Sequence, residues 1–164
     1  MSAADDREAI GQVLAEFCVG VDRLDYDLIE SCFHADAEVD FGGFVNGPVV
    51  GYFEFVRGEE GLGAFARTMH NLGTTTVEID GDVAHSQAYC VAYHSAGDDH
   101  PWCKGFVVIH ARYLDRLEKR DGRWAIARRT CAFEWGRNLT TGEAMELPAE
   151  NLGRRDRTDL AYAR

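Results

Sequence analysis

Two tight-turn signals organise the second half of the chain into long β-rich runs. One is Asp80-Gly81-Asp82, and the other is Lys119-Arg120-Asp121-Gly122. Asp-Gly pairs favour the tight turns of β-hairpins, and strands joined by such short turns run antiparallel. The second half is therefore expected to form an antiparallel sheet. The predicted strands cover residues 74–79, 84–94, 106–117 and 124–135.

The first half of the chain is helical in pattern. Over residues 6–24 apolar side chains recur every three or four positions, which marks one face of an amphipathic helix. A shorter helix is expected over residues 26–33 and a third over residues 61–67, with a short strand at 37–41 and a loop at 42–51. Helices at one end and antiparallel strands at the other predict an α+β fold.

The length of 164 residues fits one domain. We expect this domain to cover residues 1–135. Residues 136–164 carry few apolar anchors, and they are expected to form a C-terminal tail. Such a tail either is mobile or packs on the pocket or on a neighbouring subunit.

Charge and composition exclude several classes of partner. Seventeen Lys and Arg against 28 Asp and Glu give a net charge of −11, which repels nucleic acid and anionic lipid. No run reaches the roughly 18 apolar residues that a membrane helix needs, and the acidic N-terminus lacks the apolar segment of a secretory signal. Five scattered cysteines without a CxxC pair suit a reducing compartment. We therefore expect a cytoplasmic protein.

Three local stretches give the chain a family resemblance. They are residues 17–25 with 32–37, residues 69–74, and residues 113–117 with 121–126. On these stretches, residues 6–135 resemble the SnoaL-like branch of the NTF2-like superfamily, which includes scytalone dehydratase, bile-acid 7α-dehydratase and hexachlorocyclohexane dehydrochlorinase. The resemblance implies a cone, in which a strongly curved antiparallel sheet wraps around N-terminal helices and encloses an apolar pocket.

The resemblance also implies site residues. The family's helix-1 aspartate corresponds to Asp22, and the histidine at the head of its first long strand corresponds to His70; in the related enzymes these two form an Asp–His dyad. A second histidine, one strand later, corresponds to His94. The arginine of the dehydrochlorinase corresponds to Arg129. This chain departs from the pattern at Phe17, where the related enzymes carry lysine or tyrosine, so their substrates do not carry over.

Such a dyad suits β-elimination. A neutral imidazole accepts a proton from carbon near neutral pH, because the reference pKa of imidazole is about 6.5. A carboxylate on the other ring nitrogen fixes the tautomer and stabilises the imidazolium. We expect His94 to protonate the leaving group and Arg129 to stabilise developing negative charge. A flat, ring-bearing substrate is expected to contact Phe17, Phe41, Tyr89 and Trp135.

Other roles for these residues stay open. Asp22 lies near a helix–helix turn and could cap the second helix instead. His70 could be held by a backbone carbonyl at the end of a helix. Either Arg128 or Arg129 faces the cone, depending on the register of the strand.

No cofactor or metal is expected. The loop from His94 to His100, with Cys103 nearby, contains donors but matches no HxxxH or CxxC spacing. No GxGxxG motif follows a strand, and no GxSxG elbow is present.

The sequence therefore predicts a cofactor-independent lyase of the dehydratase type, or an isomerase, acting on a small hydrophobic and cyclic molecule. The alternatives are a non-catalytic ligand-binding or accessory protein, and a cyclase or epoxide hydrolase that uses Asp22 to direct water. Members of this branch commonly form dimers or trimers through the outer face of the sheet. We expect a homo-oligomer, with Val107 and Ile109 on that face.

Overall fold

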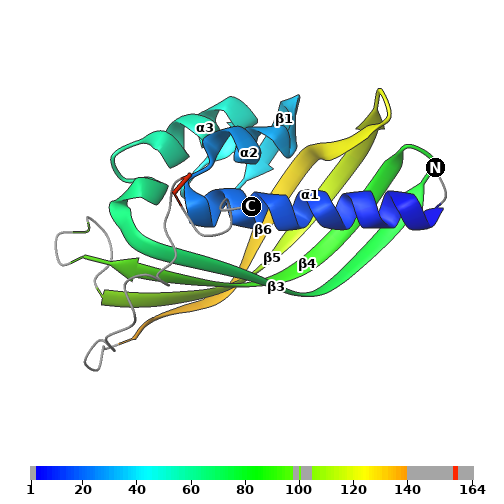
Figure 1. The fold of residues 1–164 in the computed structure, drawn as a ribbon. Coiled ribbons are helices and arrows are strands. Elements are labelled where there is room, and N and C mark those ends of the chain that lie inside the picture. The colour runs from blue at the N-terminus through cyan, green and yellow to red at the C-terminus, as the bar shows by residue number, and fades with distance from the viewer. Residues whose placement is uncertain (1–2, 98–99, 101–104, 140–156, 159–164) are drawn as a thin grey trace.

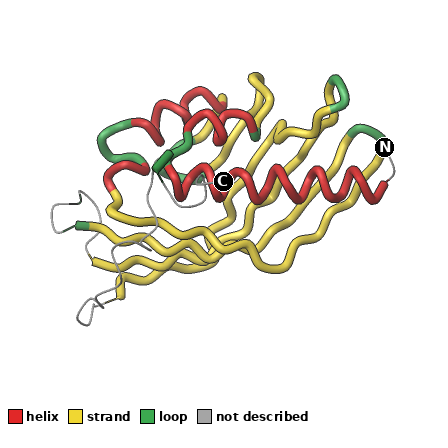
Figure 2. Tube along the Cα trace, in the orientation of Figure 1, coloured by secondary structure: helices red, strands yellow, loops and turns green. Residues whose placement is uncertain are grey.

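The structure is a computed structural model that describes residues 3–97, 100, 105–139 and 157–158. Its elements are shown in Figures 1 and 2. In chain order they are α1 (Ala3–Arg23), α2 (Tyr26–Ser31), β1 (Phe33–Asp40), β2 (Asn46–Pro48), α3 (Val49–Arg57), the 3-10 helix η1 (Leu62–Ala64), β3 (Phe65–Asp80), β4 (Val83–Ala96), β5 (Gly105–Arg120) and β6 (Arg123–Leu139).

Six strands form one strongly bent sheet in the order β2-β1-β6-β5-β4-β3. Neighbouring strands are antiparallel, except that β1 and β6 are parallel. The two tight turns at Asp80 and Arg120 join β3 to β4 and β5 to β6, as predicted. The long helix α1 lies across the concave side of the sheet, and α2 and α3 lie beside one end of it (Figure 1). The expected α+β cone is confirmed.

The core lies between α1 and the concave face of the sheet. The buried face of α1 has the predicted three-and-four spacing and includes Ile10, Leu14 and Phe17. The turn that follows α1 is tight, because Gly20 lies against Ile29 of α2. A Cβ added at Gly20 would lie 2.9 Å from Ile29 Cγ1. The absence of a side chain at position 20 therefore lets the first two helices pack closely.

The third helix is not where the sequence pattern placed it. Residues 61–67 contain only the short η1 helix and the beginning of β3, so the predicted helix there is wrong. The helix is α3, and it begins at Val49, inside the stretch expected to be a loop. Its buried residues, Val49, Tyr52 and Val56, have helical spacing, and Pro48 precedes its first turn. The glycine-interrupted stretch after it belongs to the connection into β3.

Two β-bulges in β6 decide which of its side chains face the helices. Ile126 pairs with Leu117 but Arg128 pairs with Arg116, so one extra residue lies between them in β6. A second shift occurs opposite His110 and Ala111. Because side chains alternate along a strand, each extra residue reverses which face the following side chains take.

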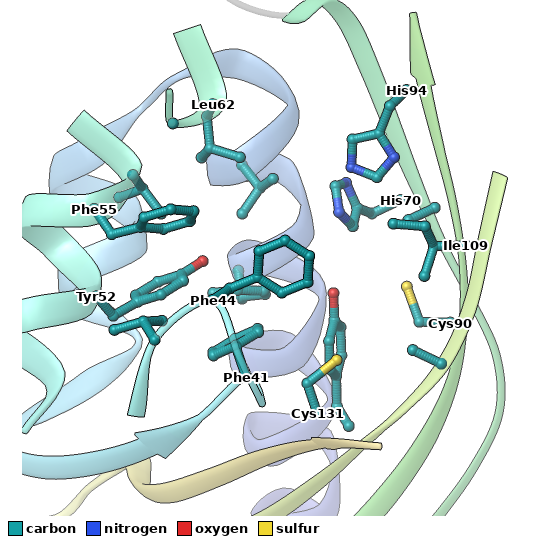
Figure 3. A pocket seen from close by; sticks show the side chains of 18 of the residues that line it. Phe41, Phe44, Tyr52, Phe55, Leu62, His70, Cys90, His94, Ile109 and Cys131 are labelled. Carbon is teal, nitrogen blue, oxygen red and sulfur yellow. The ribbon is translucent and has the colours of Figure 1, made fainter. Parts of the chain in front are cut away.

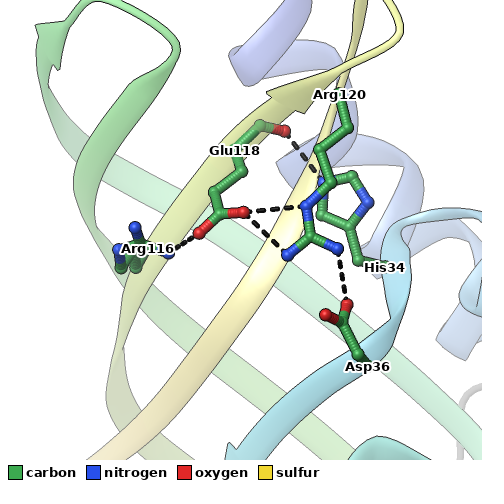
Figure 4. Close-up of polar contacts among 5 residues, drawn as sticks. All are labelled: His34, Asp36, Arg116, Glu118 and Arg120. Atoms are coloured by element: carbon green, nitrogen blue, oxygen red, sulfur yellow. Dashed lines mark hydrogen bonds and ion pairs between the residues drawn. The ribbon is translucent and has the colours of Figure 1, made fainter.

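A polar network ties β1 to the hairpin between β5 and β6 (Figure 4). His34 Nε2 donates to the carbonyl oxygen of Glu118 at 2.9 Å. Arg120 bonds the carboxylates of Asp36 and Glu118, and Arg116 pairs with the other oxygen of Glu118. Burial lowers the pKa of His34, and Arg120 and Arg123 lower it further. His34 is therefore neutral near pH 7, with Arg120 and Arg123 close to its ring.

The last strand is longer than predicted, because β6 continues through Leu139 rather than ending at residue 135. Most of the expected tail lies outside the described residues. Within the described part, the Arg157 guanidinium lies 3.0 Å from the Asp25 carboxylate, at the turn between α1 and α2. Among the helices that the structure describes, none is long and apolar enough to cross a membrane.

Candidate active site

A cavity of about 120 Å³ lies between the concave face of the sheet and the helices. On the helix side it is walled by aromatic rings, and on the sheet side by histidines and cysteines (Figure 3). Such a space is of the order of the roughly 150 Å³ cavity that holds one benzene ring in another protein. The residues that line it are Phe17, Val21, Phe41, Phe44, Val45, Tyr52, Phe55, Val56, Glu60, Gly61, Leu62, Phe65, His70, Cys90, Ala92, His94, Ile109, Ala111, Tyr113, Cys131 and Phe133.

Asp22 and His70 meet at the wall of this cavity. Asp22 lies in the last turn of α1, and His70 lies in β3. The Asp22 Oδ1 atom lies 2.7 Å from His70 Nδ1, and Oδ2 accepts the backbone N–H of His70 at 2.8 Å. Both side chains are largely buried, with exposed fractions of 16% and 8%. The carboxylate and the ring are therefore held by two hydrogen bonds, away from most of the solvent.

Thr68 completes the surroundings of the carboxylate. It lies two residues before His70 on the same face of β3, and its hydroxyl donates to Asp22 Oδ1 at 3.0 Å. Burial acts to raise the pKa of Asp22, but hydrogen bonds from His70 and Thr68 outweigh it, and the pKa lies below its usual value. Asp22 is therefore an ionised acceptor near neutral pH.

This ionised acceptor defines the tautomer of His70. A carboxylate oxygen only accepts, so the proton of the short contact is on His70 Nδ1. In the neutral form of the ring the lone pair is then on Nε2, the other nitrogen of a ring that lines the cavity. The arrangement can accept a proton at Nε2 and stabilise the resulting positive charge through Asp22.

His94 lies next to His70 in the cavity wall. It comes from β4, where it pairs with Thr68 of β3, and the two histidine rings meet edge-on with centroids 5.5 Å apart. The centroid of the Phe65 ring lies 4.7 Å from the centroid of the His94 ring and 4.4 Å from that of the His100 ring. His94 is thus buried beside His70 at the end of the cavity lined by Phe65.

Arg129 faces the interior of the cone, whereas Arg128 is exposed. The first bulge of β6 explains this, because simple alternation from the buried Ile126 would have turned Arg128 inward. Arg129 does not line the cavity. It makes a two-pronged ion pair with Asp115, with distances of 2.8 and 2.7 Å, and its guanidinium lies 4.1 Å from the centre of the Phe17 ring.

The electrostatics of this pair fit a fully buried arginine. Burial acts to lower the pKa of Arg129, but the charge and hydrogen bonds of Asp115 outweigh it and raise the pKa. The guanidinium also lies 4.3 Å from the centre of the Tyr113 ring. Phe17 and Tyr113 both line the cavity, so Arg129 packs behind two of the rings that form its wall.

Two of the four predicted pocket aromatics line the cavity, namely Phe17 and Phe41. Tyr89 does not, and this prediction is corrected: it alternates with the inward-facing Cys90 and is 48% exposed on the outer face of β4. Trp135 is corrected for a different reason. The second bulge of β6 turns it outward, where it stacks on His110 with ring centroids 3.7 Å apart.

Sequence reasoning missed three functional candidates: Thr68, Tyr113 and Cys90. Thr68 and Cys90 lie an even number of positions from the predicted residues His70 and His94 on the same strands, so they face the same way. Tyr113 shares a face of β5 with Asp115, the ion-pair partner of Arg129. The signal was available for Cys90, which shares the alternating face of β4 with His94. For Thr68 the pattern gives no such signal, because the first long strand is predicted to begin only at residue 74.

Metal ligands do not gather in the described part of the chain. Among those residues there is no group of three or more His, Cys, Asp or Glu side chains that could hold a metal ion. Asp98, Asp99 and Cys103 of the loop considered above lie outside the described residues. His70 and His94 both line the cavity, but among the described residues they form no such group with a third ligand.

The curved antiparallel sheet packed on N-terminal helices, with an apolar cavity between them, is the architecture of the NTF2-like fold. Within it, the chain belongs to the SnoaL-like domain family, whose model matches residues 2–130. An uncharacterized protein of Mycobacterium tuberculosis is 30% identical over 87 residues. That match covers 52% of this chain and 58% of the relative, so it spans little more than half of either protein.

Solved structures agree on the fold. A hexachlorocyclohexane dehydrochlorinase from Novosphingobium barchaimii aligns over 88% of this chain and 97% of its own, with a TM-score of 0.76 and 18% identity. A structure described as a putative scytalone dehydratase, from Novosphingobium aromaticivorans, aligns over 86% and 92%, with a TM-score of 0.72 and 19% identity. At these identities the likeness concerns the fold alone.

Proposed function

We propose that the protein is a cofactor-independent lyase that carries out a dehydratase-type β-elimination, or an isomerase, on a small hydrophobic cyclic substrate. The observation that carries the proposal is the 2.7 Å contact between Asp22 and His70 in the wall of an apolar cavity. Membership of the SnoaL-like family and the fold shared with a dehydrochlorinase support it.

In the proposed elimination, His70 Nε2 removes a proton from a substrate carbon. The electron pair of that C–H bond forms the new C=C bond, and the leaving group departs from the adjacent carbon with its own bonding pair. Asp22 stabilises the imidazolium that forms on His70. His94, 5.5 Å from His70 between ring centroids, protonates a departing hydroxyl group. For an isomerase, His70 returns the proton to a different carbon of the same substrate.

The cavity limits the substrate. Its volume of about 120 Å³ and its aromatic wall fit a single small ring better than a long chain or a polyanion. Glu60 at its edge and the net charge of −11 disfavour anionic substrates. Arg129 forms an ion pair with Asp115 and does not line the cavity. We therefore assign the chemistry to Asp22, His70 and His94.

The experiment is a panel of small cyclic alcohols, halides and enones, incubated with the wild-type protein and with His70→Gln. Products are identified by mass spectrometry, and solvent deuterium incorporation reports reversible proton removal. We expect turnover or deuterium exchange of at least one compound by the wild type and a loss of about 100-fold or more in His70→Gln. Binding of a panel compound without turnover or exchange would instead identify a ligand-binding protein, which is the alternative function.

We also propose that the protein is a homo-oligomer, a dimer or a trimer, formed through the outer face of the sheet. The predicted contact residues need correction: Val107 is buried and Ile109 lines the cavity. Exposed apolar side chains on the outer face of the sheet include instead Met69, Tyr89, Tyr93 and Trp135. Light scattering of the wild type and of Tyr89→Arg tests this, and a monomeric wild type would contradict it.

A further inference from the structure

A buried hydroxyl group, that of Tyr52, lies on the helix side of the cavity. Tyr52 belongs to α3, lines the cavity and is only 5% exposed. Figure 3 shows its hydroxyl oxygen pointing from α3 into the space between the helices and the sheet. Within the part of the chain that the structure describes, no hydrogen bond joins this hydroxyl to another group. The hydroxyl is therefore a buried polar group that faces a ligand space.

The wall around Tyr52 is otherwise apolar. The helix side also contributes Glu60 to the lining, but that residue is exposed to solvent. A ligand oxygen that faces this wall away from the edge of the cavity therefore finds its hydrogen-bond partner, among the described side chains, in Tyr52. The apolar neighbours of Tyr52 in the lining are Phe41, Phe44, Val45, Phe55, Val56 and Leu62.

Neighbouring rings fix the position of this hydroxyl. The ring of Phe41 stacks on that of Tyr52, with centroids 4.8 Å apart and planes 7° from parallel. The rings of Phe17 and Phe33 have their centroids 6.2 Å from that of Tyr52. The C–O bond of a tyrosine lies along the axis of its ring, so a flip of the ring does not move the oxygen. The hydroxyl is thus in place before a ligand binds, which reduces the entropy lost on binding.

The hydroxyl is available as a donor near neutral pH. Burial raises the pKa of Tyr52 above its ordinary value, so the group stays protonated. A buried donor without a partner disfavours folding, and phenylalanine would fill the same space without that disadvantage. A ligand that brings an acceptor into the cavity would satisfy the group.

We propose that Tyr52 is a ligand-binding residue of the cavity, which donates a hydrogen bond to the carbonyl oxygen of a small, neutral cyclic ketone. A carbonyl oxygen only accepts hydrogen bonds, so it leaves nothing unpaired against this wall. The hydroxyl group of an alcohol would bring a hydrogen for which the apolar neighbours of Tyr52 offer no acceptor. Glu60 and the net charge of −11 disfavour a carboxylate in the same place.

The site has a consequence for the orientation of a substrate. Tyr52 and His70 come from opposite walls of the cavity (Figure 3). A ketone substrate would have its oxygen at the helix wall, and the carbon that loses a proton would lie on the side of the sheet. This consequence rests on the proposed function, whereas the binding site itself does not.

The test compares two ligands of the same shape, cyclohexanone and methylenecyclohexane, which differ by C=O against C=CH₂. Ligand-observed NMR titrations of the full chain give the Kd of each ligand for the wild type and for Tyr52→Phe, which removes only the hydroxyl. We expect the preference of the wild type for the ketone over the alkene to fall about tenfold in Tyr52→Phe, the usual effect of one net hydrogen bond.

Two further variants make the same chemical change elsewhere. Tyr26→Phe is the matched control, because Tyr26 packs against Arg57 and does not line the cavity. It should keep the wild-type ratio of the two affinities. Tyr113 also lines the cavity, but it comes from the sheet. Tyr113→Phe should change the ratio less than Tyr52→Phe does. Circular dichroism checks that each variant is folded before the titrations.

Infrared difference spectra of bound cyclohexanone give a second readout, which the wild type alone provides. A hydrogen bond to the carbonyl oxygen lowers its stretching frequency relative to the ketone in an alkane solvent. We expect this lowering in the wild type and a return towards the alkane value in Tyr52→Phe. A purely structural role of Tyr52 would leave the frequency unchanged.

Four results would overturn the proposal. They are no binding of cyclohexanone, an unchanged affinity ratio in folded Tyr52→Phe, a larger change in Tyr113→Phe, and a carbonyl band at the alkane value in the wild type. His70→Gln should keep the wild-type ratio, because the base is not the donor. Absence of turnover in the substrate panel with this ratio intact would contradict the elimination alone, so the two proposals can fail separately.

Discussion

Asp22 holds His70 through both of its carboxylate oxygens. Oδ2 accepts the backbone N–H of His70, and Oδ1 contacts Nδ1 of the same residue's ring. Because one carboxylate binds both the backbone and the side chain of a single residue, the ring has a defined orientation relative to its own strand. This two-point contact joins the last turn of α1 to β3 at the cavity wall.

Replacing Asp22 by asparagine should remove activity while preserving the fold. The amide introduced by Asp22→Asn would offer either a neutral oxygen or an N–H group to Nδ1, and the second choice puts the ring proton on Nε2, the atom needed as the base. The equivalent change in a serine protease triad costs about 10⁴-fold in kcat. With a substrate from the panel, we expect a loss of about 10³-fold or more in kcat and little change in KM. A kcat within about tenfold of wild type would exclude the dyad.

Thr68 should act as a positioning residue for Asp22. Thr68→Val keeps the shape of the side chain and removes the donor 3.0 Å from Oδ1, so the pKa of Asp22 should rise. We expect the acidic limb of the pH–kcat profile to move to higher pH. The free energy of unfolding, measured in urea, should fall by about 1–2 kcal/mol. Thr68→Ser retains the hydroxyl and is the control. If both variants have the wild-type pH profile, the hydroxyl has no positioning role.

The family resemblance predicts that Asp22 and His70 form a pair, and in the structure Asp22 Oδ1 lies 2.7 Å from His70 Nδ1. The alternative role for Asp22, capping α2, is filled by Asp25, whose side chain accepts the backbone N–H of Leu28. Local capping therefore did not compete for Asp22. Its distant partner in β3 could be found only through the family pattern.

Residue faces along β6 could not be predicted, because they depend on bulges. A bulge adds one residue to one strand of a pair, and nothing in the local sequence of Arg128 and Arg129, or of Trp135, announces it. The same limit does not explain Tyr89. The alternation of β4 places Tyr89 on the face opposite His94, so the two side chains cannot both line one pocket.

Arg129 should contribute to stability rather than to chemistry. Arg129→Met leaves Asp115 buried without its partner, which typically costs about 3–5 kcal/mol. Asp115→Leu combined with Arg129→Met replaces the pair by apolar side chains and should recover most of that loss. Urea unfolding gives the free energies, and kcat per folded molecule of the double variant should stay within a few-fold of wild type. A stable double variant that has lost kcat by about 100-fold would assign Arg129 to the chemistry.

His34 should make the protein less stable in mild acid. Its pKa is lowered in the folded state, so between that pKa and the unfolded value of about 6.5 the unfolded chain binds more protons. Stability is therefore complete above about pH 6.5 and falls as the pH decreases through that value towards the folded pKa. Urea unfolding at a series of pH values measures this loss.

His34→Gln is the matched variant for this effect, because its amide can still donate to the Glu118 carbonyl but does not titrate. Burial also lowers the pKa of His100, so the variant should reduce the acid sensitivity without abolishing it. An unchanged pH dependence in His34→Gln would show that His34 carries no linked proton. Circular dichroism at about pH 8, above the titration range of histidine, checks that the variant is folded before the series begins.

Two glycines of α1 should respond in opposite directions to the same substitution. A Cβ at Gly20 would lie 2.9 Å from Ile29 Cγ1 and 3.2 Å from the Asp25 carbonyl oxygen, so the α1–α2 contact would have to open. A Cβ at Gly11 meets nothing within 4 Å, and this glycine is exposed. In a helix interior, alanine is preferred to glycine by about 0.5–1 kcal/mol.

Gly11→Ala should therefore raise the free energy of unfolding by about that amount, whereas Gly20→Ala should lower it by about 1–3 kcal/mol because of overpacking. Urea unfolding of both variants beside the wild type makes the comparison, and a stabilised Gly20→Ala would contradict the close approach of the first two helices.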